Sequence, residues 1–114
     1  MKLDHKKEND AVVVTPRERA INAAVVLDFK NQMIQLVEEG NADFVINLSD
    51  VEVIDSSGLG ALVSVVKRVG KNGEIKLSNA RENIRSLFEL TRLDKVFGFY
   101  HSEEDALASF RNKG

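Results

Sequence analysis

The 114-residue sequence contains no cysteine and no tryptophan, and it has only one proline and two histidines. Without cysteine the chain can form neither disulfide bonds nor thiolate metal sites, which fits a reducing compartment. His5 and His101 lie in charged regions near opposite ends of the chain. A Ser-His-Asp arrangement would need these distant ends to reach one serine, so we expect both histidines to be exposed to solvent.

The sequence also lacks a strong charge of one sign and long apolar runs. Its formal net charge is −2, and no basic cluster with interleaved aromatic residues appears, so direct binding to nucleic acid is disfavoured. No apolar run approaches the roughly 18 residues of a membrane span. Residues 1–7 are charged and lack the apolar core of a signal peptide. We therefore expect a soluble cytoplasmic protein with neither nucleic-acid nor membrane partners.

Length and patterning predict a single domain over residues 1–114. A chain of this size has enough material for one core and could bury roughly two-thirds of its unfolded surface. No internal repeat or linker divides it. Strand-like and helix-like apolar patterns alternate along the chain. The expected strands are residues 2–8, 11–15, 44–48, 74–78 and 96–99, and the expected helices are residues 23–39, 59–70, 80–89 and 102–110.

This order of elements predicts an α/β (α+β) fold, with a mixed sheet of four to five strands and about four helices packed on it. Residues 8–10 are expected to turn between the first two strands, and Pro16 closes the β-branched run that follows. Gly40 ends the first helix in the usual C-terminal position. The almost continuously apolar run 44–48 is typical of a central strand covered on both faces.

The stretch Val51–Val69 organises the chain. It begins with apolar residues that look like the end of a buried strand, turns at residues 55–58 (Asp-Ser-Ser-Gly) and continues as an amphipathic helix. The two serines therefore lie at a helix entrance, where N–H groups and the helix dipole favour capping oxygens and tolerate a phosphate. Capping alone would explain only one of these polar residues. Gly58 and Gly60 cost stability in a first helical turn, which suggests that something approaches the backbone closely.

Known catalytic and cofactor motifs do not fit the sequence. The nucleophile elbow G-x-S-x-G is absent, because an isoleucine or a valine stands where its first glycine would be. The Gly58-x-Gly60 pair lacks the third glycine of a dinucleotide fingerprint, and Val65 occupies the place of the earlier glycine that a P-loop would need. Scattered carboxylates offer no obvious metal site. We expect no enzymatic activity, no cofactor and no metal.

The run Asn47–Leu62 (NLSDVEVIDSSGLGAL) resembles the signature of the STAS domain family, specifically the bacterial anti-sigma factor antagonists. Leu90–Phe97 (LTRLDKVF) is similar to a run near the end of such domains, so the resemblance covers most of the chain and implies the STAS fold. In that family the D-S-S/A-G-L-G turn carries a serine that is phosphorylated by an anti-sigma factor, itself a serine kinase. The resemblance implies that Ser56 is the modified residue and that the neighbouring Ser57 caps the helix and acts as a spacer.

The resemblance also implies regulation by partner switching. While unphosphorylated, such a protein captures the ATP-binding anti-sigma factor kinase and frees a sigma factor. Once phosphorylated, it releases the kinase, and a metal-dependent serine phosphatase removes the phosphate. The nucleotide and the metal are therefore bound by the partner proteins. A monomer or a weak homodimer is expected. The residues implied in partner binding are Asp55, Ser56, Ser57, Gly58, Leu59, Gly60 and Asn22.

One segment departs from the family pattern. Such domains carry a G-x-L/I-D run after the second strand, and its aspartate helps to contact the kinase. This chain has Arg17–Asn22 (RERAIN) there, so the glycine is missing and Asn22 replaces the aspartate. The replacement keeps the shape of the side chain and removes its charge.

Two alternatives remain open at this point. The first is a STAS module that serves as a scaffold in a stress-signalling or transport complex, in which Ser56 is never modified. The second is a small nucleotide-binding or hydrolytic enzyme that uses the glycine turn. Incubation with kinases and ATP tests the former, and calorimetric titration with ATP and GTP tests the latter.

Overall fold

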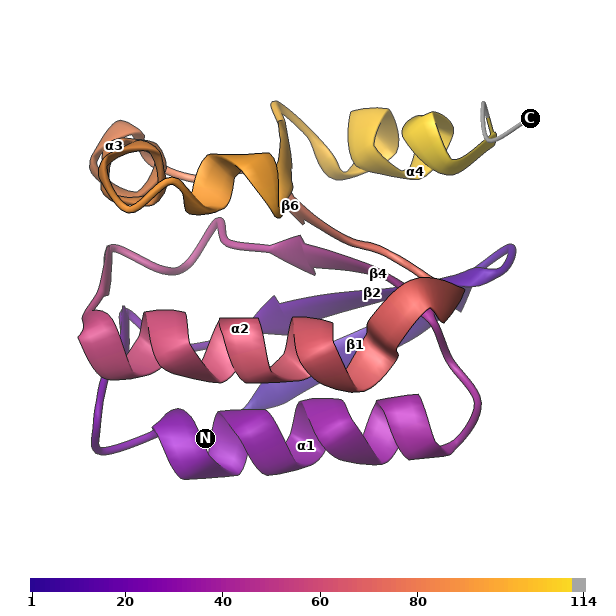
Figure 1. Cartoon of the computed structure of the whole chain (residues 1–114), viewed down its shortest axis with the longest axis horizontal. Helices are drawn as coiled ribbons and strands as arrows, with labels where there is room; N and C mark the ends of the chain where they lie inside the picture. The colour runs from indigo at the N-terminus through magenta and orange to yellow at the C-terminus, as the bar shows by residue number, and fades with distance from the viewer. Residues whose placement is uncertain (112–114) are drawn as a thin grey trace.

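The computed structural model describes residues 1–111 and contains a five-stranded mixed sheet with helices on both faces (Figure 1). The strands lie in the order β1-β2-β4-β6-β7. β1 and β2 form an antiparallel hairpin, and the other neighbouring pairs are parallel. The bounds are Leu3–Glu8 for β1, Ala11–Pro16 for β2, Asp43–Asn47 for β4, Ile75–Ser78 for β6 and Gly98–Tyr100 for β7.

Four α-helices lie within the described range, so the predicted mixed sheet with about four helices is confirmed. Their bounds are Val26–Glu38 for α1, Ser56–Val69 for α2, Glu82–Leu90 for α3 and Glu103–Arg111 for α4. α1 and α2 lie side by side on one face of the sheet, and α4 lies on the opposite face (Figure 1). Among residues 1–111, no helix has both the length and the apolar character needed to cross a membrane.

Alternate residues of the central strand β4 contribute to two separate cores. Phe44 and Ile46 join the larger core on the α1–α2 side, which includes Phe29 of α1. Val45 points to the other face and packs in a smaller cluster with Ala106 of α4. All of these side chains are fully buried. The uninterrupted apolar run in this strand follows from its coverage on both faces.

A second, two-stranded sheet precedes α2 and differs from the prediction. β5 (Val53–Ile54) pairs in parallel with β3 (Ala20–Ile21), outside the main sheet. The sequence predicted a buried strand end here, and Val51 and Ile54 are buried, whereas Val53 between them is 50% exposed. The Arg19 guanidinium bridges the two segments, with Nε and Nη2 donating to the two Glu52 carboxylate oxygens at 2.9 and 3.2 Å.

Several predicted boundaries shift by a few residues, including the start of α3, which begins at Glu82 rather than at residue 80. α1 begins at Val26 rather than at residue 23, because Asn22 first organises a turn. α2 begins at Ser56, so the turn residues already belong to the helix. β7 begins after the predicted start of the last strand, because a 3-10 helix, Leu93–Lys95, precedes it. Gly40, with a φ of 104°, lies directly after the end of α1 as predicted.

Candidate functional site

The pairing of β3 with β5 brings two segments that are distant in sequence to the start of α2. Ile21 is the register partner of Ile54, so the residues that follow, Asn22 and Asp55, leave the two strands at the same end. The Asp55 N–H donates to the Ile21 carbonyl oxygen at 3.2 Å. Asn22, which the sequence implicated in partner binding, thus lies next to the serine turn.

Asp55 is the N-cap of α2. Its Oδ1 accepts hydrogen bonds from the Ser57 hydroxyl at 2.6 Å and from the Gly58 N–H at 3.0 Å. The Ser57 hydroxyl, followed by the Gly58 N–H, holds the pKa of Asp55 below its ordinary value of 3.8, and the Ala23 N–H contributes in the same direction. The carboxylate therefore connects the loop before α1 to the first turn of α2.

The two serines of the turn have different environments. The Ser57 hydroxyl is bonded to Asp55, and the residue is partly buried. The Ser56 side chain is exposed and makes no hydrogen bond to any residue of the described range 1–111. Ser56 is also the first residue of α2, at the positive end of the helix dipole. Its hydroxyl is therefore accessible and unengaged, whereas that of Ser57 is part of the cap.

Gly58 and Gly60 have different roles. A Cβ atom on Gly58 would lie 2.6 Å from the Ile21 carbonyl oxygen and 2.7 Å from Ile54 Cγ2, so the close approach predicted from the paired glycines is made here by the chain itself. Nothing lies within 4 Å of the corresponding position on Gly60, which is exposed. Leu59 is buried in the main core. Gly58 and Leu59 therefore lie beneath the site and pack against the rest of the fold. Gly60 forms part of the exposed surface of the site.

Asn22 organises the turn that precedes α1 rather than projecting as a free amide. Its Oδ1 accepts from the Ala24 N–H at 3.0 Å, and its carbonyl oxygen accepts from the N–H groups of Val25 and Val26 at 3.0 and 2.9 Å. The side chain remains partly exposed. Asn22 thus combines a structural role in the turn with a position at the edge of the serine site.

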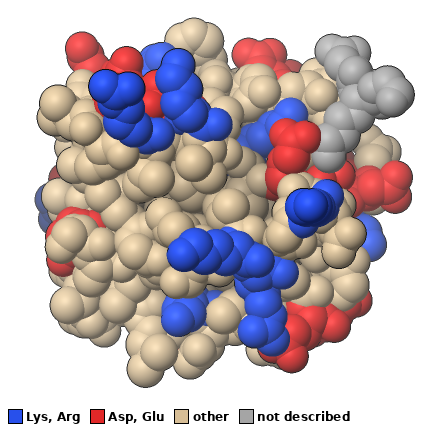
Figure 2. Space-filling model, in the orientation of Figure 1, with Lys and Arg blue, Asp and Glu red and all other residues tan. Residues whose placement is uncertain are grey.

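The surface at the start of α1 and α2 exposes both acidic and apolar side chains, among them Asp28, Asp55 and Leu27. α1 and α2 begin at the same end of the molecule (Figure 1), and Leu27 in the first turn of α1 is 67% exposed. Lys and Arg side chains gather instead over the C-terminal half of α2, whose last turn contains Lys67 and Arg68 (Figure 2). Sequence reasoning missed Leu27, because one exposed leucine cannot be distinguished from its buried neighbours within an apolar helix.

The described residues offer little for catalysis. In residues 1–111, no group of three or more His, Asp or Glu side chains could hold a metal ion. His5 and His101 are both exposed, as predicted. His5 lies on β1 and His101 follows β7, which are the two opposite edge strands of the main sheet.

Comparison with known proteins agrees with this fold. The STAS domain pattern matches residues 3–106 of the chain. The chain is similar to the anti-sigma-B factor antagonist of Bacillus subtilis, with 38% identity over 92 residues that cover 80% of this chain and 82% of the relative. A crystal structure from Thermotoga maritima superimposes with a TM-score of 0.90 at 27% identity and covers 96% of this chain and 95% of that one.

The fold is also shared with the Bacillus cell fate determinant SpoIIAA, which has been solved in two forms. Its unphosphorylated form gives a TM-score of 0.75 at 16% identity and covers 97% of this chain and 99% of that one. Its phosphorylated form gives a TM-score of 0.74 at 18% identity, with coverages of 96% and 100%. At these identities the likeness shows the fold alone.

Proposed function

Since the chain belongs to the STAS domain family of anti-sigma factor antagonists, we propose that Ser56 is a phosphorylation switch that controls its capture of an anti-sigma factor serine kinase. The unphosphorylated chain binds the kinase and so releases a sigma factor, and phosphorylation of Ser56 ends the binding. The observation that carries this proposal is the contrast between the two serines. Ser56 is exposed and unengaged, whereas Ser57 is held by Asp55.

The helix entrance can accept a phosphate without unfolding. Phosphorylation adds about −1.5 to −2 charges, and the first-turn N–H groups and the dipole of α2 favour an anion at this place. The cap does not depend on Ser56, because the Asp55 carboxylate bonds to Ser57 and Gly58. The fold therefore survives the modification.

A partner that packs on the unmodified surface meets a neutral hydroxyl one helical turn from the open position at Gly60. After phosphorylation the same partner meets a bulky anion close to the Asp55 carboxylate. Both the lost packing and the added negative charge weaken binding, and each 1.4 kcal/mol lost reduces affinity about tenfold. In this cycle the kinase transfers the γ-phosphoryl group of its bound ATP to the Ser56 hydroxyl and releases ADP, and a serine phosphatase hydrolyses the phosphoserine back to the neutral hydroxyl.

The test uses the 114-residue chain, ATP and recombinant anti-sigma factor kinases of the source organism, with mass spectrometry to locate phosphate. Wild type should be modified at Ser56, and Ser56→Ala should resist modification and remain bound to the kinase. Ser86→Ala, at an exposed serine of α3, is the matched control and should be modified like wild type. Phosphate that continues to enter Ser57 in the Ser56→Ala chain would show that the wrong hydroxyl has been chosen.

Ser56→Asp tests the consequence of the charge. Its circular dichroism spectrum and melting temperature should match those of wild type, while kinase capture weakens at least about tenfold. A collapse of the fold would instead make Ser56 a structural residue.

A second candidate function is a scaffold module of a stress-signalling or transport complex whose Ser56 is not modified. The observation that favours it is Asn22, which occupies the place of the family's kinase-contacting aspartate and is used in the turn before α1. Under this alternative no kinase modifies Ser56, and Ser56→Asp leaves partner binding unchanged.

A further inference from the structure

The two faces of the main sheet present different side chains to the helices that cover them. Towards α1 and α2, the strands β2, β4 and β6 direct the apolar side chains of Val12, Val14, Phe44, Ile46, Ile75 and Leu77. Towards α4, one row across the same strands consists of Val13, Val45 and Lys76, and the next row consists of Thr15, Asn47 and Ser78. The face beneath α4 is therefore polar along one whole row, at the carboxyl ends of these strands.

The apolar contact between α4 and the sheet is small. Its cluster has three buried side chains, Val13, Val45 and Ala106, and only Ala106 comes from α4. An alanine removes little apolar surface from water, so its burial contributes little free energy. The main core is much larger and includes the fully buried rings of Phe29, Phe44, Phe88 and Phe97. Hydrophobic burial therefore holds α4 on the sheet much less firmly than it holds α1 and α2.

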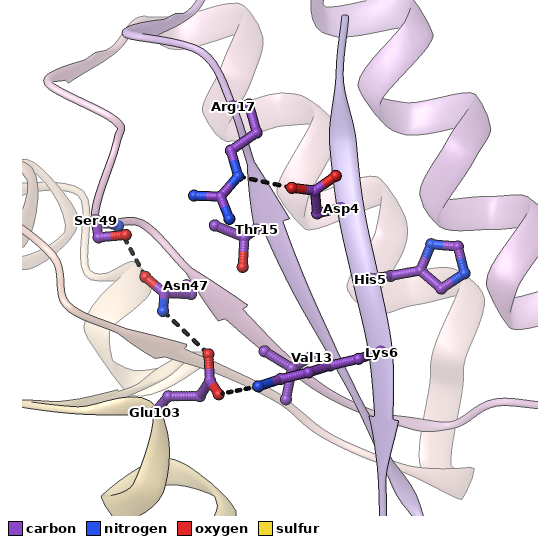
Figure 3. Close-up of a pocket in the computed structure, with 9 residues that line it drawn as sticks. All are labelled: Asp4, His5, Lys6, Val13, Thr15, Arg17, Asn47, Ser49 and Glu103. Carbon is purple, nitrogen blue, oxygen red and sulfur yellow. Dashed lines mark hydrogen bonds and ion pairs between the residues drawn. The ribbon is translucent and has the colours of Figure 1, made fainter.

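Polar contacts connect α4 to the sheet near each of its ends. At the start of α4, Glu103 Oε2 lies 3.0 Å from Lys6 Nζ, and Glu103 Oε1 accepts from Asn47 Nδ2 at 3.1 Å (Figure 3). Lys6 also lies 3.8 Å from Glu8 and its side chain is 56% exposed, and ion pairs exposed to this extent contribute little to stability. Near the end of the helix, Lys76 Nζ donates to Ser109 Oγ at 2.6 Å and lies 3.7 Å from Glu74.

The buried hydroxyl of Ser78 opposes the docking of α4. Ser78 is fully buried, and its Oγ has no hydrogen-bond partner among residues 1–111. Its register partners are Asn47, which bonds to Glu103, and Tyr100, which packs against the cluster of Ala106. Ser78 therefore lies beneath the start of α4. A buried hydroxyl without a partner has lost its hydration at a cost in free energy, and departure of α4 would return water to it.

We propose that α4 is a detachable cover, which leaves the sheet and returns to it as one unit while the main core stays folded. A helix of nine residues is not stable alone in water, so α4 unfolds when it leaves. Opening uncovers Val13, Val45 and Lys76 on the face of the sheet opposite to α1 and α2 (Figure 1). The entrance of α2 is not part of this face. The open chain thus keeps its serine turn and gains a second accessible surface.

Amide hydrogen exchange of the 114-residue chain, followed by NMR at several urea concentrations below the unfolding transition, tests the proposal. The helical amides of residues 106–110 should share one protection factor, at least about tenfold below that of residues 30–38 in α1. Urea should lower the protection of all the α4 amides together, because opening of the whole helix exposes surface to solvent. The amides of α1 should respond only as the whole chain unfolds.

Three variants test the contacts that hold or oppose the cover. Ser78→Ala removes the unpaired hydroxyl, so it should raise the protection of α4 about three- to tenfold. Glu103→Gln removes the ion pair with Lys6 and should lower that protection about two- to fivefold. Glu104→Gln is the matched control, because it removes an exposed acid from the same helical turn, and it should change the protection of α4 less than Glu103→Gln does. The protection of α1 should stay unchanged in all three.

Three results would overturn the proposal. Equal protection of α4 and α1 would show that α4 opens only when the whole chain unfolds. Protection that declines steadily towards residue 110 and does not depend on urea would show fraying of the helix end in place of opening as a unit. Unchanged or lower protection of α4 in Ser78→Ala would contradict the polar mismatch beneath the helix on which the proposal rests.

Discussion

The Ser57 hydroxyl donates a 2.6 Å hydrogen bond to the Asp55 carboxylate, while the adjacent Ser56 hydroxyl has no partner within residues 1–111. Two chemically identical side chains therefore have separate tasks. Ser57 helps to hold the entrance of α2, and Ser56 can change its charge while the cap stays in place. Substitutions at this entrance can separate the two roles.

Asp55→Asn tests how much the negative charge of the N-cap residue contributes to stability. Asn keeps an oxygen that accepts from Gly58, but it loses the stabilisation that lowers the pKa of Asp55. That stabilisation is full above the ordinary value of 3.8 and is lost as the pH falls through the lower folded pKa. We expect the variant to melt below wild type at neutral pH and the difference to vanish in acid. Asp10→Asn, at an exposed turn aspartate without a side-chain hydrogen bond within the described residues, is the control and should melt like wild type at neutral pH.

Ser57→Ala and Ser56→Ala form a matched pair one residue apart. Ser57→Ala removes the hydroxyl that contributes most to the lowered pKa of Asp55, so it should lower the urea midpoint and raise the pKa of Asp55 in NMR titrations. Ser56→Ala removes a hydroxyl that is unengaged within residues 1–111 and should change neither quantity. Equal midpoints for the two variants would refute the division of roles.

Gly58→Ala and Gly60→Ala should act in opposite directions. At Gly58 the new methyl group would meet the Ile21 carbonyl oxygen at 2.6 Å, and overpacking of this kind costs about 1–3 kcal/mol. At Gly60 the space is open, and alanine stabilises an exposed helix by about 0.5–1 kcal/mol relative to glycine. Melting temperatures should therefore diverge, by about 4 °C per kcal/mol at this chain length. Weaker kinase capture by the more stable Gly60→Ala chain would indicate that the partner contacts this backbone.

Lys76 connects β6 to α4 through both its stem and its ammonium group. Its side chain is 8% exposed, and Nζ donates to Ser109 Oγ at 2.6 Å and lies 4.3 Å from the Phe110 ring centroid. Lys76→Met keeps the volume and leaves Ser109 bonded to the Ala106 carbonyl, so it should change stability by less than about 1.5 kcal/mol. Lys76→Ala leaves a cavity and should cost about 2 kcal/mol or more in urea denaturation. Equal losses of stability in both variants would show that the ammonium charge of Lys76, rather than its aliphatic side chain, stabilises the fold.

Asn22→Asp restores the acidic group of the family pattern. An aspartate oxygen can still accept from the Ala24 N–H, so stability should change by less than about 1 kcal/mol. We expect the variant to capture the kinase more strongly in surface plasmon resonance. Unchanged capture would mean that this position lies outside the interface.

The main sheet could be predicted from the sequence because its strands carry strong local signals. The run Phe44–Ile46 is apolar without interruption, and Gly40 ends the preceding helix, so both the strand and its coverage follow from residue types. β3 and β5 could not be predicted in this way, because strands of two residues show no periodicity. Their pairing depends on contacts between segments more than 30 residues apart.

The candidate site was partly predictable for the same reason. The turn residues Asp55 and Ser56 are contiguous, and their capping chemistry is local. That Ile21 is the group approaching Gly58 depends on tertiary packing. Likewise, Thr15 and Asn47 come together only through the register of β2 with β4, which residue types alone do not determine.

The outermost strand β1 exposes Lys6, Lys7 and Glu8 at one free border of the sheet. A second copy that extended the ladder there would have to strip water from these charged side chains as it aligned its backbone. Growth of a fibre by addition of strands at β1 is therefore unfavourable. The chain remains available for reversible binding to other proteins.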